Sequence, residues 1–276
     1  MQLAATLAQA DALFEILPRP VGFIPTMGAL HDGHLALVRR AREECVAVVA
    51  SVFVNPLQFA AGEDLDRYPR DFEGDREKLA HAGVDVLFAP PNDAMYPPGF
   101  STGIDVGAIG AGFEGAARPT HFRGVATVVG KLLHLVKPDR LYLGQKDAQQ
   151  TAVVRRMVRD LAFDAQVVVV PTVREADGLA LSSRNAYLSA AERAAAPSLH
   201  ASLLAFRDAL AQGASKAQAY ERAKTIVDPL AHLHYLDIVD AQTFEPLETL
   251  RSDAFAIGAA NFGATRLLDN LWIESL

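Results

Sequence analysis

The run Val46–Val54 constrains the fold more than any other stretch of this chain. It is almost entirely apolar and rich in valine, and polar and apolar side chains do not alternate along it. A strand of that composition needs apolar cover on both faces, as a strand has in a parallel sheet with helices on either side. The run therefore predicts an α/β protein in which strands and helices alternate along the chain.

The rest of the first half follows this alternation, with apolar periods typical of buried strands and of helices that pack on them. Together they predict a Rossmann-like, doubly wound parallel sheet. The segment 90–115 is so rich in proline and glycine that we expect an irregular connection there, either a lid or an ordinary surface loop. The further strands are expected at 21–25, 84–88, 139–143 and 167–170, and the helices before Pro18, at 35–44, 75–82 and 125–136, and through Arg159.

The pattern changes at Ser189. Ser189 and Glu192 form a capping-box signature for a long alanine-rich helix that extends to about Ala211. A second helix is expected at 215–228, and short strands at 235–239, 255–260 and 265–268. We therefore expect a smaller C-terminal α+β domain, with a boundary in the loop 173–185, which gives domains 1–174 and 175–276.

Composition narrows the class of protein. The chain has 276 residues, 50% of them hydrophobic, and a net charge of −7, which argues against a general nucleic-acid surface. The single cysteine, Cys45, can form no internal disulfide and is expected to be a buried packing residue. The N-terminus lacks the pattern of a secretory signal, and no apolar run reaches membrane-spanning length. We expect a soluble cytoplasmic protein with no nucleic-acid and no membrane partner.

The stretch 24–34, Ile-Pro-Thr-Met-Gly-Ala-Leu-His-Asp-Gly-His, joins the strand 21–25 to the following helix. A strand that enters a helix through a glycine-containing turn presents unpaired backbone N–H groups and a positive dipole end, which suit a phosphate. Gly33 lies between the two histidines, and we expect it to keep them out of the ordinary helical turn that would otherwise hold them. His31 and His34 can donate hydrogen bonds to phosphoryl oxygens. Zinc ligation by the two histidines is the alternative, although no His-Glu-x-x-His arrangement and no cysteine cluster stands nearby.

Polar residues also follow other strands, where α/β sheets bind ligands. Asn55 and Gln58 follow the run 46–54. Lys146, which suits a phosphate, and Asp147, which can accept from ribose, follow the strand 139–143. The cluster 182–184, Ser-Ser-Arg, could close over phosphates or belong to an interdomain linker. Three further residues either line an anion site or are solvated charges at a helix entry: Arg118, His121 and Arg123.

Taken together, the motifs at 25–34, 53–59, 144–150 and 181–185 resemble those of the pantothenate synthetase family, the pantoate–β-alanine ligases. The resemblance covers nearly the whole chain, because it extends through Tyr-Pro-Arg at 68–70, His-Phe-Arg-Gly at 121–124 and Asp-Ile-Val-Asp at 237–240. One departure is Thr120, where we expect glycine in much of the family. It leaves the conformation of that helix entry open.

This resemblance implies an ATP-dependent ligase of the nucleotidyltransferase superfamily that carries the His-x-Gly-His signature. Pantoate would attack the α-phosphorus of ATP to form pantoyl adenylate and pyrophosphate, and the amine of β-alanine would then displace AMP. Mg²⁺ would arrive with ATP and bridge phosphate oxygens, with no metal ligands from the protein. The family further implies a homodimer.

The resemblance also implies roles for particular residues. His34, His31, Lys146 and Arg184 would be catalytic. Val173 would lie against adenine, Gly144 and Asp147 would hold ribose, and Gln58 and Gln150 would bind pantoate, with Asn55 near the pantoate and β-alanine site. The full ATP-binding set would be Met27, Gly28, Ala29, Leu30, His31, Asp32, Gly33, His34, Gly144, Gln145, Lys146, Asp147, Val173, Leu181, Ser182, Ser183 and Arg184.

Two other functions use the same pocket. A related nucleotidyltransferase would transfer a nucleotide to a phosphorylated acceptor and keep the two joined. A non-catalytic sensor would bind ATP without turnover. The paired glutamines favour a small hydroxy acid as substrate over the first alternative, and the intact His31, His34, Lys146 and Arg184 argue against the second.

Overall fold

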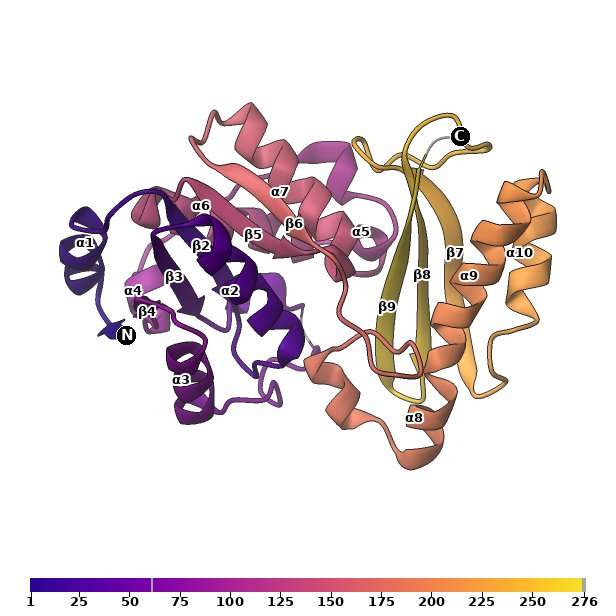
Figure 1. The fold of residues 1–276 in the computed structure, drawn as a ribbon, viewed down its shortest axis with the longest axis horizontal. Coiled ribbons are helices and arrows are strands. Elements are labelled where there is room, and N and C mark those ends of the chain that lie inside the picture. The colour runs from indigo at the N-terminus through magenta and orange to yellow at the C-terminus, as the bar shows by residue number, and fades with distance from the viewer. Residues whose placement is uncertain (61, 275–276) are drawn as a thin grey trace. The chain divides into compact units, whose positions relative to one another are not determined.

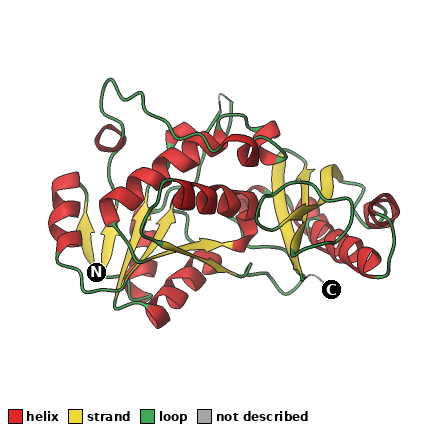
Figure 2. Cartoon of the chain, turned by 90° about the horizontal axis from the view of Figure 1, so that it is seen from above, coloured by secondary structure: helices red, strands yellow, loops and turns green. Residues whose placement is uncertain are grey.

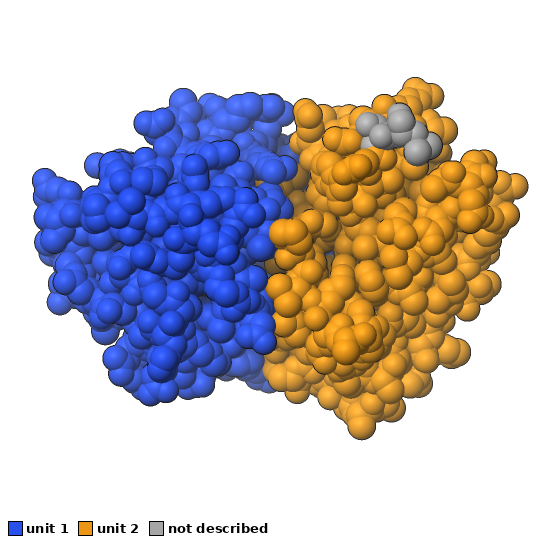
Figure 3. Space-filling view, in the orientation of Figure 1, with its two compact units in different colours: residues 1–144, 153–170 blue, residues 145–152, 171–276 orange. Residues whose placement is uncertain are grey.

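A computed structural model of the protein describes residues 1–60 and 62–274. These residues divide into two compact units (Figure 3). Unit 1 comprises Met1–Gly144 and Val153–Val170, and unit 2 comprises Gln145–Ala152 and Pro171–Leu276. The expected boundary followed residue 174. The units instead change at 170/171, and the segment 145–152, which follows β5, groups with unit 2.

Unit 1 is built on a six-stranded parallel sheet with the strand order β1-β4-β3-β2-β5-β6 (Figure 1). The predicted doubly wound sheet is confirmed. The order reverses between neighbours β2 and β5, which is where ligands bind in such sheets. The very short β1 was not predicted, because the residues before Pro18 were all assigned to a helix. The strands are β1 Gln2–Ala4, β2 Val21–Thr26, β3 Ala47–Val52, β4 Val86–Phe88, β5 Arg140–Gly144 and β6 Gln166–Val170.

Both faces of this sheet are covered, which explains why its strands are apolar throughout. Phe23 and Val49 belong to the core with helices α1 (Leu7–Glu15), α6 (His121–Val136) and the later turns of α7 (Ala148–Asp160). Ile24 and Val48 belong to the opposite core with α2 (Asp32–Glu44) and α3 (Phe72–His81). Cys45 is buried in this second core, as expected.

The connection through residues 90–115 contains no long element, as its proline and glycine content predicted. It holds the short helices α4 (Asn92–Met95) and η2 (Gly107–Gly110), and α5 (Glu114–Ala117) begins at its end. A further short helix, η1 (Pro56–Gln58), follows β3. Three predicted helices begin earlier than expected, because α2 starts at Asp32, α3 at Phe72 and α6 at His121.

Unit 2 contains a three-stranded antiparallel sheet, β7-β8-β9, and its helices (Figure 2). Leu203 and Phe206 of α9 share a core with Ile238 of β7. The Ser189 capping box is confirmed, but the expected long helix is split at Pro197, which occupies the first turn of α9. The elements are η3 Gln145–Asp147, η4 Ser183–Tyr187, α8 Ala190–Ala195, α9 Pro197–Ala211, α10 Lys216–Lys224, β7 Ala231–Asp240, β8 Ala254–Phe262 and β9 Thr265–Ile273.

Within residues 1–60 and 62–274, no helix combines the length and the apolar character that crossing a membrane requires.

Candidate active site

The two histidines of the His-x-Gly-His turn begin helix α2 (unit 1). His31 is the N-cap residue, and its Nδ1 accepts from the backbone N–H of Gly33 at 3.2 Å. His34 Nδ1 accepts from the N–H of His31 at 3.3 Å, and the two rings lie 4.1 Å apart between centroids. Because both Nδ1 atoms accept, these hydrogen bonds assign the proton of each neutral ring to Nε2. Each imidazole can therefore donate from Nε2 to a phosphoryl oxygen.

Asp75 of α3 supports this turn and was missed by sequence reasoning. Its carboxylate, 1% exposed, accepts from the N–H groups of Ala29 and Leu30, both at 2.7 Å. Lys78 Nζ donates to the carbonyl of Leu30 at 2.9 Å. The expectation that the backbone N–H groups of the turn are unpaired is therefore wrong at Ala29 and Leu30. Asp75 read as an ordinary first-turn acidic residue, so no local signal distinguished it.

Gly28 is needed for both conformation and space. Its φ is +84°, in the region that favours glycine, and a Cβ there would lie 2.9 Å from Asp75 Oδ2 and 3.2 Å from Val52 Cγ1. Gly33 has a different role from the one expected. It lies within the first turn of α2 and donates to the capping ring of His31, so the histidines are held by a helical turn after all.

Asn55 and Gln58 are brought together at the end of β3. Asn55 Nδ2 donates to the Gly124 carbonyl at 3.1 Å and to Gln58 Oε1 at 3.0 Å. Tyr96 donates to Asn55 Oδ1 at 2.8 Å, and burial raises the pKa of this hydroxyl. Gln58 Nε2 then points toward Met27 Sδ, at 3.1 Å. Gln58 thus presents an amide donor, and Asn55, which is 1% exposed, mainly orients it.

Arg118 and His121 contact the backbone that carries Gln58, whereas Arg123 is exposed as a solvated charge would be. Arg118 pairs with Glu63 and donates to the carbonyl of Gln58 at 3.1 Å, and His121 Nδ1 lies 3.0 Å from the same carbonyl. This pairing with Arg118 lowers the pKa of Glu63 against the opposing effect of burial. Arg123 is exposed. These contacts fix the backbone that carries Gln58.

The helix entry at 120–124 is compatible with the departure from the family pattern. Thr120 has φ −97° and ψ −9°, which any residue adopts, so threonine needs no glycine-like conformation. Gly124, in contrast, has no room for a side chain, because a Cβ would overlap the carbonyl of Leu57.

Lys146 lies in η3, directly after β5 (unit 2). Its side chain is 21% exposed, and Nζ lies 3.5 Å from Asp147 Oδ1. Asn270 of β9 donates from Nδ2 to the carbonyls of Gln145 and Lys146, both at 2.9 Å. Gln150 lies half-buried in the first turn of α7.

The residues 173–181 form a hairpin that leads into η4. The N–H of Leu181 donates to the carbonyl of Val173 at 3.0 Å, so these two predicted nucleotide contacts are neighbours. Ser182 caps η4, because its Oγ accepts from the N–H of Arg184 at 3.3 Å. The cluster 182–184 is therefore the start of a short helix held against the hairpin, which is more order than an interdomain linker requires.

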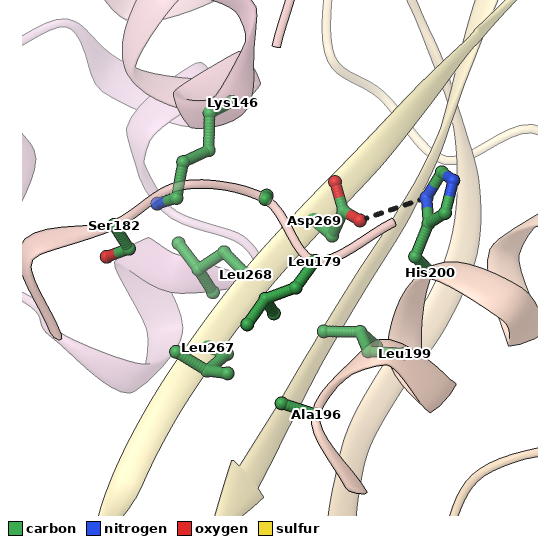
Figure 4. Close-up of a pocket in the computed structure, with 10 residues that line it drawn as sticks. Lys146, Leu179, Ser182, Ala196, Leu199, His200, Leu267, Leu268 and Asp269 are labelled. Carbon is green, nitrogen blue, oxygen red and sulfur yellow. Dashed lines mark ion pairs between the residues drawn. The ribbon is translucent and has the colours of Figure 1, made fainter. Parts of the chain in front are cut away.

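A pocket in unit 2 brings Lys146 and Ser182 to the same side of an apolar floor (Figure 4). Asp269 and His200 lie at the other end, with His200 Nδ1 3.2 Å from Asp269 Oδ2. Arg174 binds Asp269 through two hydrogen bonds, of 2.6 and 2.8 Å. Burial raises the pKa of Asp269, but His200 and Arg174 outweigh it and leave that pKa below its ordinary value. The floor consists of Leu179, Ala180, Ala196, Leu199, Leu267 and Leu268.

Comparison with known proteins identifies the family. Residues 2–272 match the family model described as pantoate-beta-alanine ligase. A curated pantothenate synthetase of Thermus thermophilus is 54% identical over 98% of this chain and 99% of its own length. A crystal structure of that species' enzyme has a TM-score of 0.94 at 55% identity and covers 98% of this chain and 99% of its own. The chain belongs to the pantoate–β-alanine ligase family.

A more distant family member adds a ligand context. The pantoate-beta-alanine ligase of Francisella tularensis, described as complexed with beta-gamma ATP and β-alanine, is 34% identical with a TM-score of 0.83, over 99% of this chain and 97% of its own. The chain described here is thus an enzyme of the ligase family. In unit 1 its fold gathers His31 with His34, and Asn55 with Gln58 and Met27. In unit 2 it gathers Lys146 with Ser182, and Val173 with Leu181.

Proposed function

We propose that this enzyme joins pantoate to β-alanine in two steps, through pantoyl adenylate, with release of pyrophosphate and then AMP. One observation carries the proposal. Two imidazoles with Nε2 donors cap α2 at the carboxyl end of β2, beside β5, where the strand order reverses. Donors fixed at such a point can stabilise charge that develops on a transferring phosphoryl group.

In the first step, the pantoate carboxylate attacks the α-phosphorus of ATP and the bond to pyrophosphate breaks. Phosphoryl transfer asks the protein mainly to align the attacking atom and to absorb negative charge. His34 and His31 donate to the phosphate oxygens, and Lys146 neutralises charge on the α-phosphoryl group. Ser182, Ser183 and Arg184 bind the remaining phosphates, which the capped start of η4 suits.

Mg²⁺ accompanies ATP in this proposal. In the described part of the chain, no group of three or more His, Cys, Asp or Glu side chains is arranged to hold a metal ion. Phosphate oxygens and water would supply ligands of the kind that Mg²⁺ prefers. When bound with ATP, the ion would supply charge neutralisation at the phosphates.

Substrate recognition follows from the remaining contacts. The amide of Gln58, oriented by Asn55, donates to an oxygen of pantoate, and Gln150 provides a second amide. Asp147 and the backbone at Gly144 hold ribose, and Val173 lies against adenine. In the second step, the amine of β-alanine attacks the carbonyl carbon of the adenylate and AMP leaves.

The test is a set of omission assays. ATP–pyrophosphate exchange is expected with pantoate and without β-alanine, and net AMP release is expected only when both are present. If the nucleotide stayed joined to the acceptor, the nucleotidyltransferase alternative would hold instead. ATP binding without exchange or release would favour the sensor.

The resemblance also supports a cytoplasmic homodimer as part of this proposal. Light scattering coupled to size-exclusion chromatography measures the mass in solution, and a mass of one chain at micromolar concentration would contradict the dimer.

A further inference from the structure

Asn270 of strand β9 holds η3, the short helix that carries Lys146. Asn270, which is 2% exposed, donates to the consecutive carbonyls of Gln145 and Lys146, both at 2.9 Å. Its Oδ1 accepts from Gln145 Nε2 at 3.3 Å. A side-chain amide has two N–H donors and one carbonyl, so Asn270 directs both donors and its acceptor to η3.

These hydrogen bonds from Asn270 fix the direction in which the Lys146 side chain leaves the backbone. A lysine side chain is a flexible stem with a point charge at its tip, so its backbone must be fixed if the charge is to be placed reproducibly. The contact of Lys146 Nζ with Asp147, at 3.5 Å, is long for a charge-assisted hydrogen bond. The two hydrogen bonds from Asn270 instead fix the backbone from which the Lys146 side chain extends. Figure 4 shows the Lys146 side chain at the pocket.

We propose that Asn270 is a positioning residue for Lys146 in adenylate formation. This inference rests on the proposed function, because it assigns the Lys146 ammonium to the α-phosphoryl group. The adjacent residue, Asp269, holds the hairpin 173–181 on the other side of the pocket. Asp269 binds Arg174, which also donates to the carbonyl of Asn270 at 3.2 Å. Neighbouring residues of β9 thus hold both η3 and the hairpin that leads to Ser182.

Removal of the Asn270 amide leaves the partly buried carbonyls of Gln145 and Lys146 without this donor and lets the backbone at Lys146 shift. A misplacement of roughly 1 Å at a group that acts in the transition state costs up to about a hundredfold in rate. We expect Asn270→Ala to lower kcat for pantoate-dependent ATP–pyrophosphate exchange by about tenfold to a hundredfold. The KM for ATP is expected to change by less than about threefold, because the other nucleotide contacts remain.

The deciding experiment is a double-mutant cycle with Lys146→Ala. If Asn270 acts through Lys146, the double variant is as slow as Lys146→Ala alone, because the group to be positioned is gone. A general structural loss would instead reduce kcat by the same factor in both backgrounds, and that result would overturn the inference. Near wild-type exchange in Asn270→Ala would overturn it too.

Two further variants guard against trivial outcomes. Asn270→Ser keeps one donor and is expected to lie between wild type and Asn270→Ala, which keeps the cycle measurable if the alanine variant does not fold. Asn261→Ala is the control. Asn261 lies on the neighbouring strand β8, its Oδ1 contacts the exposed His234, and its removal is expected to leave exchange unchanged. Absence of exchange in the wild type would refute the proposed function. Normal exchange in Lys146→Ala, with wild-type activity present, would refute the positioning inference and the role of Lys146 but leave the two-step reaction standing.

Discussion

The two groups of predicted phosphate ligands are ordered in different ways. At the start of α2, His31 and His34 are held by hydrogen bonds to residues at most three positions away. At η3, Lys146 is held by Asn270, 124 residues further along the chain. The first arrangement forms with its own strand–turn–helix unit. The second requires the last strand of the C-terminal sheet to be in place.

The largest expected effect tests the locally ordered group. His34→Ala should lower adenylate formation by about a hundredfold or more, the scale of losing one preorganised donor. His34→Asn keeps an acceptor for the N–H of His31, so the variant should be as stable as the wild type. It lacks the Nε2 donor, so adenylate formation should be as slow as in His34→Ala. His34→Gln restores a donor near Nε2 and should recover part of the rate. Pyrophosphate exchange measures all three variants.

The control is His81→Ala, which removes an exposed histidine of α3 whose Nδ1 contacts the Glu77 carbonyl. It should leave exchange unchanged. Exchange near the wild-type rate in His34→Asn would show that the Nε2 proton has no role in the first step.

The success of sequence reasoning follows the same division. His31, Gly33 and His34 could be found from the sequence because they are hydrogen-bonded to one another. The doubly wound sheet could be predicted because its apolar strands need cover on both faces. Asp75 and Asn270 could not be found. Their partners lie 45 or more residues away, and neither residue type nor local spacing distinguishes a buried carboxylate or amide from an exposed one.

Element ends were less predictable for a related reason. The first turn of α2 contains the predicted turn residues Asp32 and Gly33, so the periodic apolar pattern begins only at Leu35, after the helix has started. Alanine-rich sequence continues across Ala196, and only Pro197 shows that the helix is interrupted there.

The second prediction concerns Asp75, a distant support of the local turn. In Asp75→Asn, an amide must replace one carboxylate oxygen, so one of the two N–H groups of Ala29 and Leu30 loses its acceptor. A buried donor without a partner costs about 1–3 kcal/mol, and urea unfolding should show a loss of that size. Asp93→Asn is the control, since Asp93 is exposed and its carboxylate accepts from the N–H of the adjacent Ala94 within α4. Equal stability of Asp75→Asn and wild type would mean that the turn holds itself.

A third, smaller effect addresses substrate recognition. Gln58→Ala removes the amide donor that Asn55 orients, so the KM for pantoate should rise about tenfold, the worth of one good hydrogen bond to a charged group. The KM for ATP should change far less. Gln166→Ala is the matched control, because Gln166 is exposed at the start of β6. Equal losses for pantoate and ATP in Gln58→Ala would show that Gln58 is structural.

The smallest effect is confined to acid and tests the distantly ordered group. Asp269 is 5% exposed, and His200 and Arg174 hold its pKa below the ordinary value despite burial. A depressed pKa contributes stability that is present above the unfolded value of about 3.9 and is lost as pH falls through the folded value. The gap in unfolding free energy between wild type and Asp269→Asn should therefore narrow below about pH 4.

Urea unfolding between pH 3 and pH 7 measures this gap, and Asp208→Asn, at an aspartate whose side chain is 54% exposed, is the control that should show no such narrowing. A gap that stayed constant into acid would mean that the Asp269 carboxylate contributes no charge-dependent stability, and that packing alone holds the hairpin to β9. If the gap between wild type and Asp269→Asn narrows in acid while Lys146→Ala remains folded, the acid-sensitive part of unit 2 lies at β9, whose residue Asn270 also holds the Lys146 backbone.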